Sequence, residues 1–196
     1  RGFPVISNRD AFVAISAVVV LEFCGMRTLL IVSALLYATV VWQPSVRAQE
    51  LGAVPDHADA VLVVKSERKL YLLKAGRVLR AFDVSLGLVP NGPKQREGDF
   101  RTPEGRYRLE TRNTDSDYFL SIKVSYPDDR DRARAQAQGV DPGGQIMIHG
   151  LPNRPKQDLR RYHGSDWTDG CIAVRNADMV DIWLMTSEST PIEIRP

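Results

Sequence analysis

The stretch QIMIHGLPNRPKQDLRRYHGSDWTDGCIAVRN, residues 145–176, contains the features around which the rest of the sequence can be interpreted. It begins with a short apolar run, Ile146–Ile148, that leads directly into His149. A polar, Arg-rich segment follows, and it ends at Cys171 and a second apolar run. A cysteine attacks as its thiolate and needs a nearby base, and histidine has a pKa suited to that task near neutral pH. The pattern predicts that Cys171 and His149 act together.

Length and composition favour one globular domain with an extension. The chain has 196 residues, of which 43% are hydrophobic and 26% are charged, and this is enough apolar content for a core. The formal net charge is only +2. Because a nucleic-acid-binding protein normally shows a clustered surplus of Lys and Arg, we expect no nucleic-acid partner.

Residues 26–48 have the layout of a secretory signal peptide. A basic start at Met26-Arg27 precedes an apolar run, and small or aliphatic residues lead to a cleavage position after Ala48. Residues 1–25 are expected to be an upstream extension. The competing interpretation is an uncleaved membrane anchor, because the two apolar runs together are long enough to span a bilayer. Charges within that span would be costly, which favours the cleaved signal.

Cleavage after Ala48 would remove Cys24 and leave Cys171 as the only cysteine of an exported, periplasmic protein. A lone cysteine in an oxidising compartment forms an intermolecular disulfide or serves as a reactive thiol. A small buried apolar residue is the alternative, but the neighbouring Asp166 and Asp169 disfavour a dry core position. We therefore expect a working thiol, with membrane contact only if the N-terminal segment stays uncleaved.

Residues 49–58 are expected to be a linker, and residues 59–196 have the pattern of a single mostly-β domain. Short apolar or alternating runs separated by Gly or polar turns are typical of strands, and the first three predict an antiparallel meander. The expected strands cover residues 61–64, 69–73, 78–85, 106–111, 118–125, 146–148, 172–174 and 191–195. The fold class is therefore predicted to be mostly β, sandwich-like or barrel-like, with one or two helices.

Loops and helices complete this prediction. Residues 86–101 are dense in Gly, Pro and charge, which predicts a long loop that ends in a sharp corner at residues 102–105. Residues 128–138 favour helix but have almost no apolar face, so we expect an exposed helix or lid. Apolar residues at helical spacing predict a second helix at 177–186, with Asn176 as its N-cap. No nucleotide-binding motif or metal-ligand spacing is present, so no cofactor and no metal are expected.

These features resemble the YkuD-type L,D-transpeptidases, which are cysteine enzymes of the bacterial cell wall. The resemblance covers about residues 60–195 and rests on Thr102–Gly105, Ile148–Gly150 and Thr168–Ile172, in the family's order and at about its spacing. It implies a single catalytic domain of that fold. It further implies that Cys171 is the nucleophile and His149 its base, that the Gly150 carbonyl orients the imidazole, and that the N–H groups of Gly170 and Cys171 form the oxyanion hole.

The chain departs from the common family motif at two positions. Asp169 stands where a histidine is usual, and Ala173 stands where an arginine is usual, although Arg175 lies two residues further along the same strand face. A carboxylate near Cys171 would raise the pKa of its thiol. Asp169 is therefore expected either to point away and hold the loop or to pair with a cation, Arg175 or the substrate's amine. The Thr168-Asp169-Gly170-Cys171 form indicates a variant branch of the family.

Four residues are expected to contact substrate: Thr168, Asp169, Arg175 and His163. His163 lies in a polar loop without a strand to position it, so it ranks behind His149 as a base and is expected to be substrate-facing or solvated. Arg154, Lys156, Arg160 and Arg161 either attract carboxylates of a peptide or form a solvated loop.

The activity that the resemblance implies is acyl transfer on peptidoglycan, with roles in cell-wall biogenesis and cell shape. Cys171 would form a thioester with diaminopimelate of a tetrapeptide stem, and an acceptor amine from another stem or from a lipoprotein would resolve it. If water resolves it, the protein is an L,D-carboxypeptidase or a lipoprotein-releasing amidase. A non-catalytic wall-binding module and an unrelated exported cysteine peptidase are the remaining alternatives.

Overall fold

The computed structural model of the protein describes residues 56–196. The upstream extension predicted for residues 1–25, the signal peptide or anchor of residues 26–48, and most of the linker at 49–58 lie outside the described residues. No helix within residues 56–196 combines the length and the apolar character needed to cross a bilayer.

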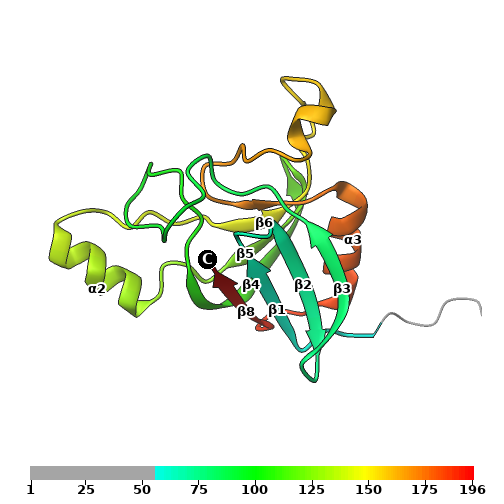
Figure 1. Ribbon diagram of the computed structural model, residues 1–196, viewed down its shortest axis with the longest axis horizontal. Helices are drawn as coiled ribbons and strands as arrows, with labels where there is room; N and C mark the ends of the chain where they lie inside the picture. The colour runs from blue at the N-terminus through cyan, green and yellow to red at the C-terminus, as the bar shows by residue number, and fades with distance from the viewer. Residues whose placement is uncertain (1–55) are drawn as a thin grey trace, which may run out of the picture. The chain divides into compact units, whose positions relative to one another are not determined.

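The described chain is mostly β with two α-helices, which confirms the predicted fold class (Figure 1). All eight predicted strands are present. The strands are β1 (Ala60–Val64), β2 (Lys69–Lys74), β3 (Arg77–Asp83), β4 (Gly105–Ser116), β5 (Phe119–Val124), β6 (Met147–His149), β7 (Ile172–Ala173) and β8 (Pro191–Arg195). The helices are α2 (Asp129–Gln138) and α3 (Asn176–Met185), with a short 3₁₀ turn, η1, at Leu159–Tyr162.

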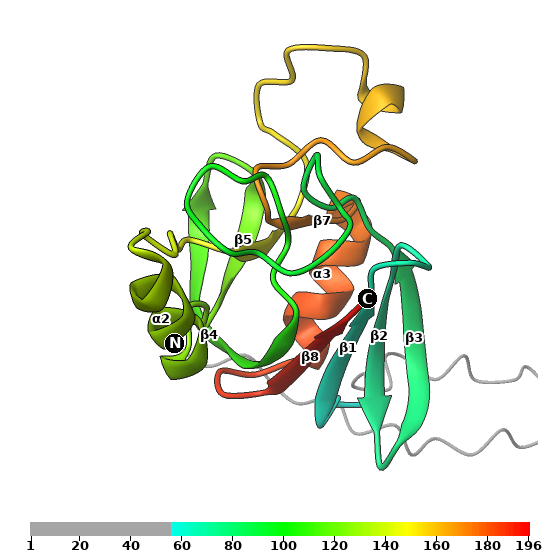
Figure 2. The ribbon, with the colours of Figure 1, turned by 60° about the vertical axis from the view of Figure 1, so that its left-hand side comes forward.

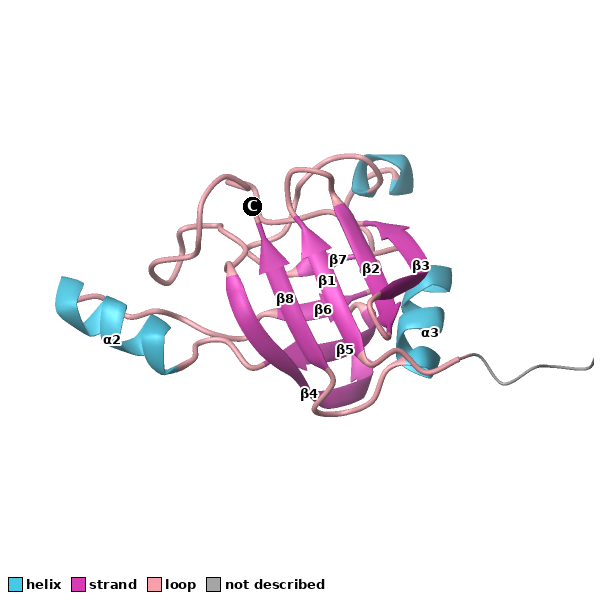
Figure 3. Cartoon of the chain, turned by 60° about the horizontal axis from the view of Figure 1, so that its bottom comes forward, coloured by secondary structure: helices cyan, strands magenta, loops and turns pink. Residues whose placement is uncertain are grey.

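The eight strands form one sheet in the order β3-β2-β1-β8-β4-β5-β6-β7. Strand β4 belongs to both halves, because its first residues pair with β8 and its later residues pair with β5. The strands of the two halves therefore cross, as Figure 3 shows. The two ends of the sheet meet where Ser85, after β3, exchanges two backbone hydrogen bonds of 2.9 Å with Ala173 of β7. The result is a nearly closed, barrel-like sheet.

Alternation along the strands explains why the two halves enclose a core. In β1, β2 and β8, every second residue is buried, and these are aliphatic: Val61, Val63, Leu70, Leu72, Ile192 and Ile194. Helix α3 adds a buried face from Met179, Ile182 and Met185. Figure 2 shows this helix between the β1–β2–β3 arm and the β4–β5 arm. Burying these side chains contributes about 1.5–3 kcal/mol each.

The predicted N-cap of α3 is wrong. The cap position is Arg175, which makes no side-chain capping bond, and Asn176 is the first residue of the helix. The Asn176 side chain instead accepts a hydrogen bond of 2.8 Å from the N–H of Leu151. It therefore holds the turn that follows β6.

Helix α2 is anchored by a buried charge, which the sequence pattern did not reveal. Asp131 is 3% exposed, and its carboxylate accepts from the Tyr107 hydroxyl at 2.9 Å and from Arg134 at 2.6 Å. The remaining helix surface is mostly exposed, as predicted. Since Arg134 also donates to the Lys94 carbonyl at 3.0 Å, the helix is fastened to the long loop at 86–101.

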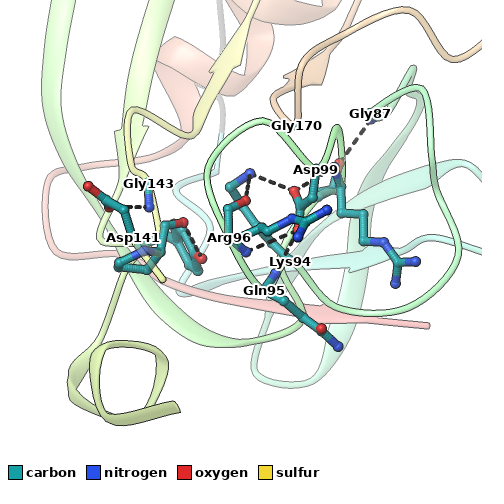
Figure 4. A network of polar contacts seen from close by, with 12 residues as sticks. Gly87, Lys94, Gln95, Arg96, Asp99, Asp141, Gly143 and Gly170 are labelled. Atoms are coloured by element: carbon teal, nitrogen blue, oxygen red, sulfur yellow. Dashed lines mark hydrogen bonds and ion pairs between the residues drawn. The ribbon is translucent and has the colours of Figure 1, made fainter. Parts of the chain in front are cut away.

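Two buried lysines organise that loop. Lys65, at the end of β1, donates to the carbonyls of Gly92 and Thr102 at 2.7 and 3.0 Å and pairs with Glu104 at 2.7 Å. Lys94 pairs with Asp99 at 2.7 Å, and the Asp99 carboxylate also accepts from three backbone N–H groups (Figure 4). The loop therefore has a fixed path despite its polar composition.

Replacing Lys65 by methionine is expected to lower the free energy of unfolding by about 3–5 kcal/mol, because it leaves the Glu104 carboxylate buried without its partner. Glu104 is only 17% exposed and the Lys65 side chain 3%. Urea unfolding followed by circular dichroism measures the loss.

Lys69→Met is the matched control. Its Lys69–Asp83 ion pair has the same 2.7 Å length, but the two side chains are 38% and 75% exposed. An exposed pair contributes about 0–1 kcal/mol, so this variant should unfold close to the wild-type midpoint. Equal midpoints for the two variants would contradict a structural role for the Lys65 contacts.

Candidate active site

Strand register brings His149 and Cys171 to one pocket. Strands β6 and β7 are parallel, with Ile148 opposite Ile172, so the last residue of β6 lies near the residue that precedes β7. The pocket has a volume of about 420 Å³. Its lining consists of one face of the β4–β5–β6 sheet, the hairpin tip between β4 and β5, and the turn before β7: Asn113, Asp115, Ser116, Asp117, Tyr118, Ser121, Gln145, Met147, His149, Trp167, Thr168, Asp169 and Cys171.

The imidazole of His149 is buried and fixed by one hydrogen bond. His149 is 5% exposed, and its Nδ1 lies 2.7 Å from the Gly150 carbonyl oxygen, which is the contact that the family resemblance implied. A carbonyl only accepts, so Nδ1 carries the hydrogen and Nε2 is left as a proton acceptor. Burial lowers the pKa of His149 to about 4, and the bond to Gly150 raises it only in part. The imidazole is therefore neutral at pH 7 and able to act as a base.

The Gly150 carbonyl is itself held in place. The Gly150 N–H donates to the carbonyls of Tyr118 and Leu120 at 3.0 and 3.1 Å. A Cβ at this position would lie 2.6 Å from the Asn176 side-chain oxygen, so only glycine fits beneath Asn176. Asn176 was not predicted as a site residue. Its only sequence signal was its place after the Cys171 strand, which indicated a helix cap instead.

Cys171 is half-buried and is the one cysteine within the described part of the chain. Burial raises the pKa of its thiol, and the nearby Asp169 carboxylate adds to this rise. A backbone hydrogen bond from Met147 and the charge of Lys94 lower the same pKa but do not offset the rise. At pH 7 the thiol is consequently protonated, and its Sγ lies 3.5 Å from the Gln145 carbonyl oxygen.

The turn before Cys171 is organised by Thr168. The Thr168 hydroxyl donates to the Cys171 carbonyl at 2.8 Å and accepts from the Gly170 N–H at 3.1 Å. The Gly170 N–H, predicted as an oxyanion-hole donor, is therefore already occupied. Gly170 has φ +132°, and a Cβ there would lie 2.7 Å from the Arg101 carbonyl oxygen. Its glycine is required by this close approach of the 86–101 loop.

Aromatic rings form a wall of the site that the sequence analysis missed. The ring centroid of Tyr118 lies 4.6 Å from that of His149, and the Trp167 centroid lies 5.7 Å from it. Tyr162 packs edge-on against Trp167 at 4.9 Å. The Tyr118 and Trp167 rings lie against the imidazole and contribute to its burial, and Tyr162 supports Trp167. Trp167 stood directly before the Thr168–Cys171 motif, and that position was the available signal.

Two residues predicted to bind substrate lie elsewhere. Arg175 and His163 line a separate cavity of about 750 Å³, and none of its lining residues also lines the Cys171 pocket. Arg175 precedes helix α3, where its guanidinium pairs with Asp178 at 2.7 Å and not with Asp169. His163 ends the η1 turn and is exposed. Because β7 ends at Ala173, the strand-face relation expected between Ala173 and Arg175 does not extend to Arg175.

The structure bears on the two roles expected for Asp169, which were to hold the loop or to pair with a cation. Its side chain is exposed and lines the Cys171 pocket, and its carboxylate makes no ion pair or hydrogen bond with any other residue in the 56–196 range. The Arg175 alternative is therefore excluded, because the Arg175 guanidinium pairs with Asp178. No group of three or more metal-ligating side chains gathers in the same range.

We expect alkylation of Cys171 by iodoacetamide to accelerate with rising pH through and beyond pH 9. The reason is that burial raises the pKa of the thiol above its ordinary value of about 8.5, so the thiolate forms only in alkaline solution. Mass spectrometry of the modified protein gives the rate at each pH. A rate that is already constant between pH 5 and 8 would indicate a thiolate–imidazolium pair and contradict this description.

Asp169→Asn provides a second test of the same electrostatics. Since the Asp169 charge raises the pKa of Cys171, its removal should increase the alkylation rate at pH 8 by about twofold or more. The control is Asp129→Asn, which removes an exposed carboxylate on α2 that does not line the pocket.

Comparison with known proteins identifies the family to which this chain belongs. "Putative L,D-transpeptidase YafK" of Escherichia coli strain K12 is 36% identical over 99 residues, which cover 46% of this chain and 37% of that protein. The crystal structure of the helical cell shape determining protein Pgp2 from Campylobacter jejuni is similar with a TM-score of 0.53 and 27% identity, over 74% of this chain and 49% of that one. The chain thus spans half or less of the length of these relatives.

A family model supplies the broader match. The model of the L,D-transpeptidase catalytic domain, YkuD, matches residues 58–194, which include β1 to β7, β8 up to its last residue, and both His149 and Cys171. The chain therefore belongs to the YkuD family of L,D-transpeptidase catalytic domains.

Proposed function

We propose that the protein is a peptidoglycan L,D-transpeptidase of the cell envelope, with Cys171 as its nucleophile and His149 as its base. The observation that carries this proposal is the 2.7 Å contact between His149 Nδ1 and the Gly150 carbonyl oxygen. With Nδ1–H bonded to the Gly150 carbonyl, Nε2 is the remaining proton acceptor, and His149 and Cys171 line the same pocket. The substrate is the tetrapeptide stem, and no cofactor takes part.

Acylation begins with a neutral thiol and a neutral imidazole. His149 Nε2 accepts the thiol proton as Sγ attacks the carbonyl carbon at the L-centre of diaminopimelate. Proton transfer coincides with attack because the high pKa of the buried thiol prevents a standing thiolate. The Cys171 N–H donates to the resulting oxyanion. Collapse of the tetrahedral adduct breaks the peptide bond, and the imidazolium returns its proton to the departing D-alanine amine.

Deacylation reverses these roles. An acceptor amine attacks the thioester carbonyl, His149 removes one of the amine's protons, and that proton returns to the departing Cys171 sulfur. A new amide bond then joins acceptor and donor, and the thiol is regenerated. A lipoprotein amine can take the acceptor position by the same steps. If water attacks, the product is a shortened stem and the protein is a carboxypeptidase or amidase.

The test is incubation of the protein with a tetrapeptide stem and an amine acceptor, with products identified by mass spectrometry. We expect release of D-alanine, a transient mass increase on Cys171 and an acceptor-linked product. Cys171→Ala should abolish all three, and His149→Ala should slow them by about 10²–10⁴-fold, which is the usual contribution of a general base.

Carbapenem labelling maps the nucleophile independently, because the β-lactam carbonyl acylates the same sulfur. The adduct should appear on the peptide that contains Cys171. Equal labelling of Cys171→Ala would disprove the nucleophile assignment. A shortened stem without acceptor-linked product would indicate that the enzyme catalyses hydrolysis and not transfer. Peptidoglycan binding without any product would indicate a wall-binding module.

A further inference from the structure

The pocket above Cys171 has an unbalanced charge. Asp115 lines it from the end of β4, Asp117 from the turn between β4 and β5, and Asp169 from the turn before β7. No Lys or Arg belongs to its lining. Other acidic side chains at the protein surface, such as Asp56 and Asp83, do pair with lysines. The three pocket carboxylates make no ion pair with any residue of the described range.

The floor of the pocket carries a second, independent signal. Ser121 is 2% exposed, yet it lines the pocket, and its hydroxyl has no hydrogen-bond partner among residues 56–196. It lies in the middle of the sheet, opposite Asn113 of β4 and His149 of β6. Buried hydroxyl groups in native proteins normally have a partner, so one that opens onto a cavity is available to bind a polar group placed there.

We propose that this pocket is a subsite for a primary ammonium group of the substrate, held by Asp115, Asp117 and Asp169 at its rim and by the Ser121 hydroxyl at its floor. The inference rests on the proposed function and identifies which group of the donor peptide the site binds. In a stem peptide with diaminopimelate, the group is the free ammonium at the far end of that residue's side chain.

Chemistry favours the donor's ammonium over that of the acceptor. An acceptor must lose a proton before it attacks, and surrounding carboxylates stabilise the charged form that cannot attack. The donor's ammonium stays charged throughout the reaction, so the carboxylates stabilise it without a penalty. Tyr118 and Trp167 line the same pocket, and their ring faces also attract a cation.

The adjacent cavity fits the other half of the same amino acid. It has a volume of about 720 Å³, shares Asp117, Tyr118 and Trp167 with the Cys171 pocket, and adds Arg154 and Lys156. Diaminopimelate carries a carboxylate next to its free ammonium. The two cavities thus offer charges of opposite sign, side by side, for a zwitterionic group.

Three donor peptides of the same sequence test the subsite: one with the free amine, one with the amine dimethylated and one with it acetylated. Dimethylation adds bulk but keeps the charge, whereas acetylation removes the charge. Acyl-enzyme formation on Cys171 in single turnover, without acceptor, isolates the donor step. We expect the free and dimethylated peptides to react within about twofold of each other, and the acetylated peptide on the order of tenfold more slowly.

Variants assign the preference to the named residues. Asp169→Asn and Ser121→Ala should each reduce the ratio between the free and acetylated peptides to about threefold or less. Asp129→Asn, an exposed carboxylate on α2, should keep the wild-type ratio. Added salt should lower the ratio, because the carboxylates are exposed and screened. A ratio near one in the wild type, or one that changes only with the acceptor, would overturn the subsite.

Binding separates this inference from the proposed function. Calorimetry with Cys171→Ala measures the affinity for the same peptides without chemistry. Preference for the charged peptides without any turnover by the wild type would keep the subsite and reject the transpeptidase. Turnover with equal affinity and rate for all three peptides would keep the transpeptidase and reject the subsite. Absence of both binding and turnover would reject both.

Discussion

The contact on which the site depends is the hydrogen bond between His149 Nδ1 and the Gly150 carbonyl. A backbone carbonyl orients the imidazole without adding a negative charge, so the buried ring stays neutral at pH 7. The bond needs a fixed carbonyl, and the sheet positions its residue through the Gly150 N–H bonds to β5 and its preceding turn, while the Leu151 N–H of the same peptide group donates to Asn176. Asn176 closes the arrangement from the start of α3. The sheet, helix α3 and His149 are thereby linked through the backbone of Gly150.

Buried charges extend this constraint to the far wall of the site. Lys65 and Lys94 are almost completely buried, and each binds a carboxylate and at least one loop carbonyl. They fix the loop that ends at Arg101, whose carbonyl touches Gly170 next to the nucleophile. A polar loop held in this way cannot drift from the Cys171 turn without leaving charges unpaired, which is costly.

Strand positions could be predicted because most are apolar or alternating runs between turn residues, and the His149–Gly150 contact was implied by the family resemblance. The side-chain partners that come from distant parts of the sequence could not be predicted. Nothing near Asp131 in the sequence indicates Tyr107, and nothing near Lys65 indicates Glu104, since side chains from different elements meet only once the sheet has closed. Arg175 was misplaced because β7 ends at Ala173, and the aromatic wall was missed because Tyr118 and Trp167 are distant in sequence.

Nitrogen-15 NMR of the His149 side chain tests the central constraint most directly, because the two ring nitrogens give different shifts in each protonation state. The expected spectrum at pH 7 shows a neutral ring with hydrogen on Nδ1 and none on Nε2, and it changes only as the pH approaches about 4. A cationic ring at pH 7, or a hydrogen on Nε2, would contradict the role of the Gly150 carbonyl and of His149 as the base.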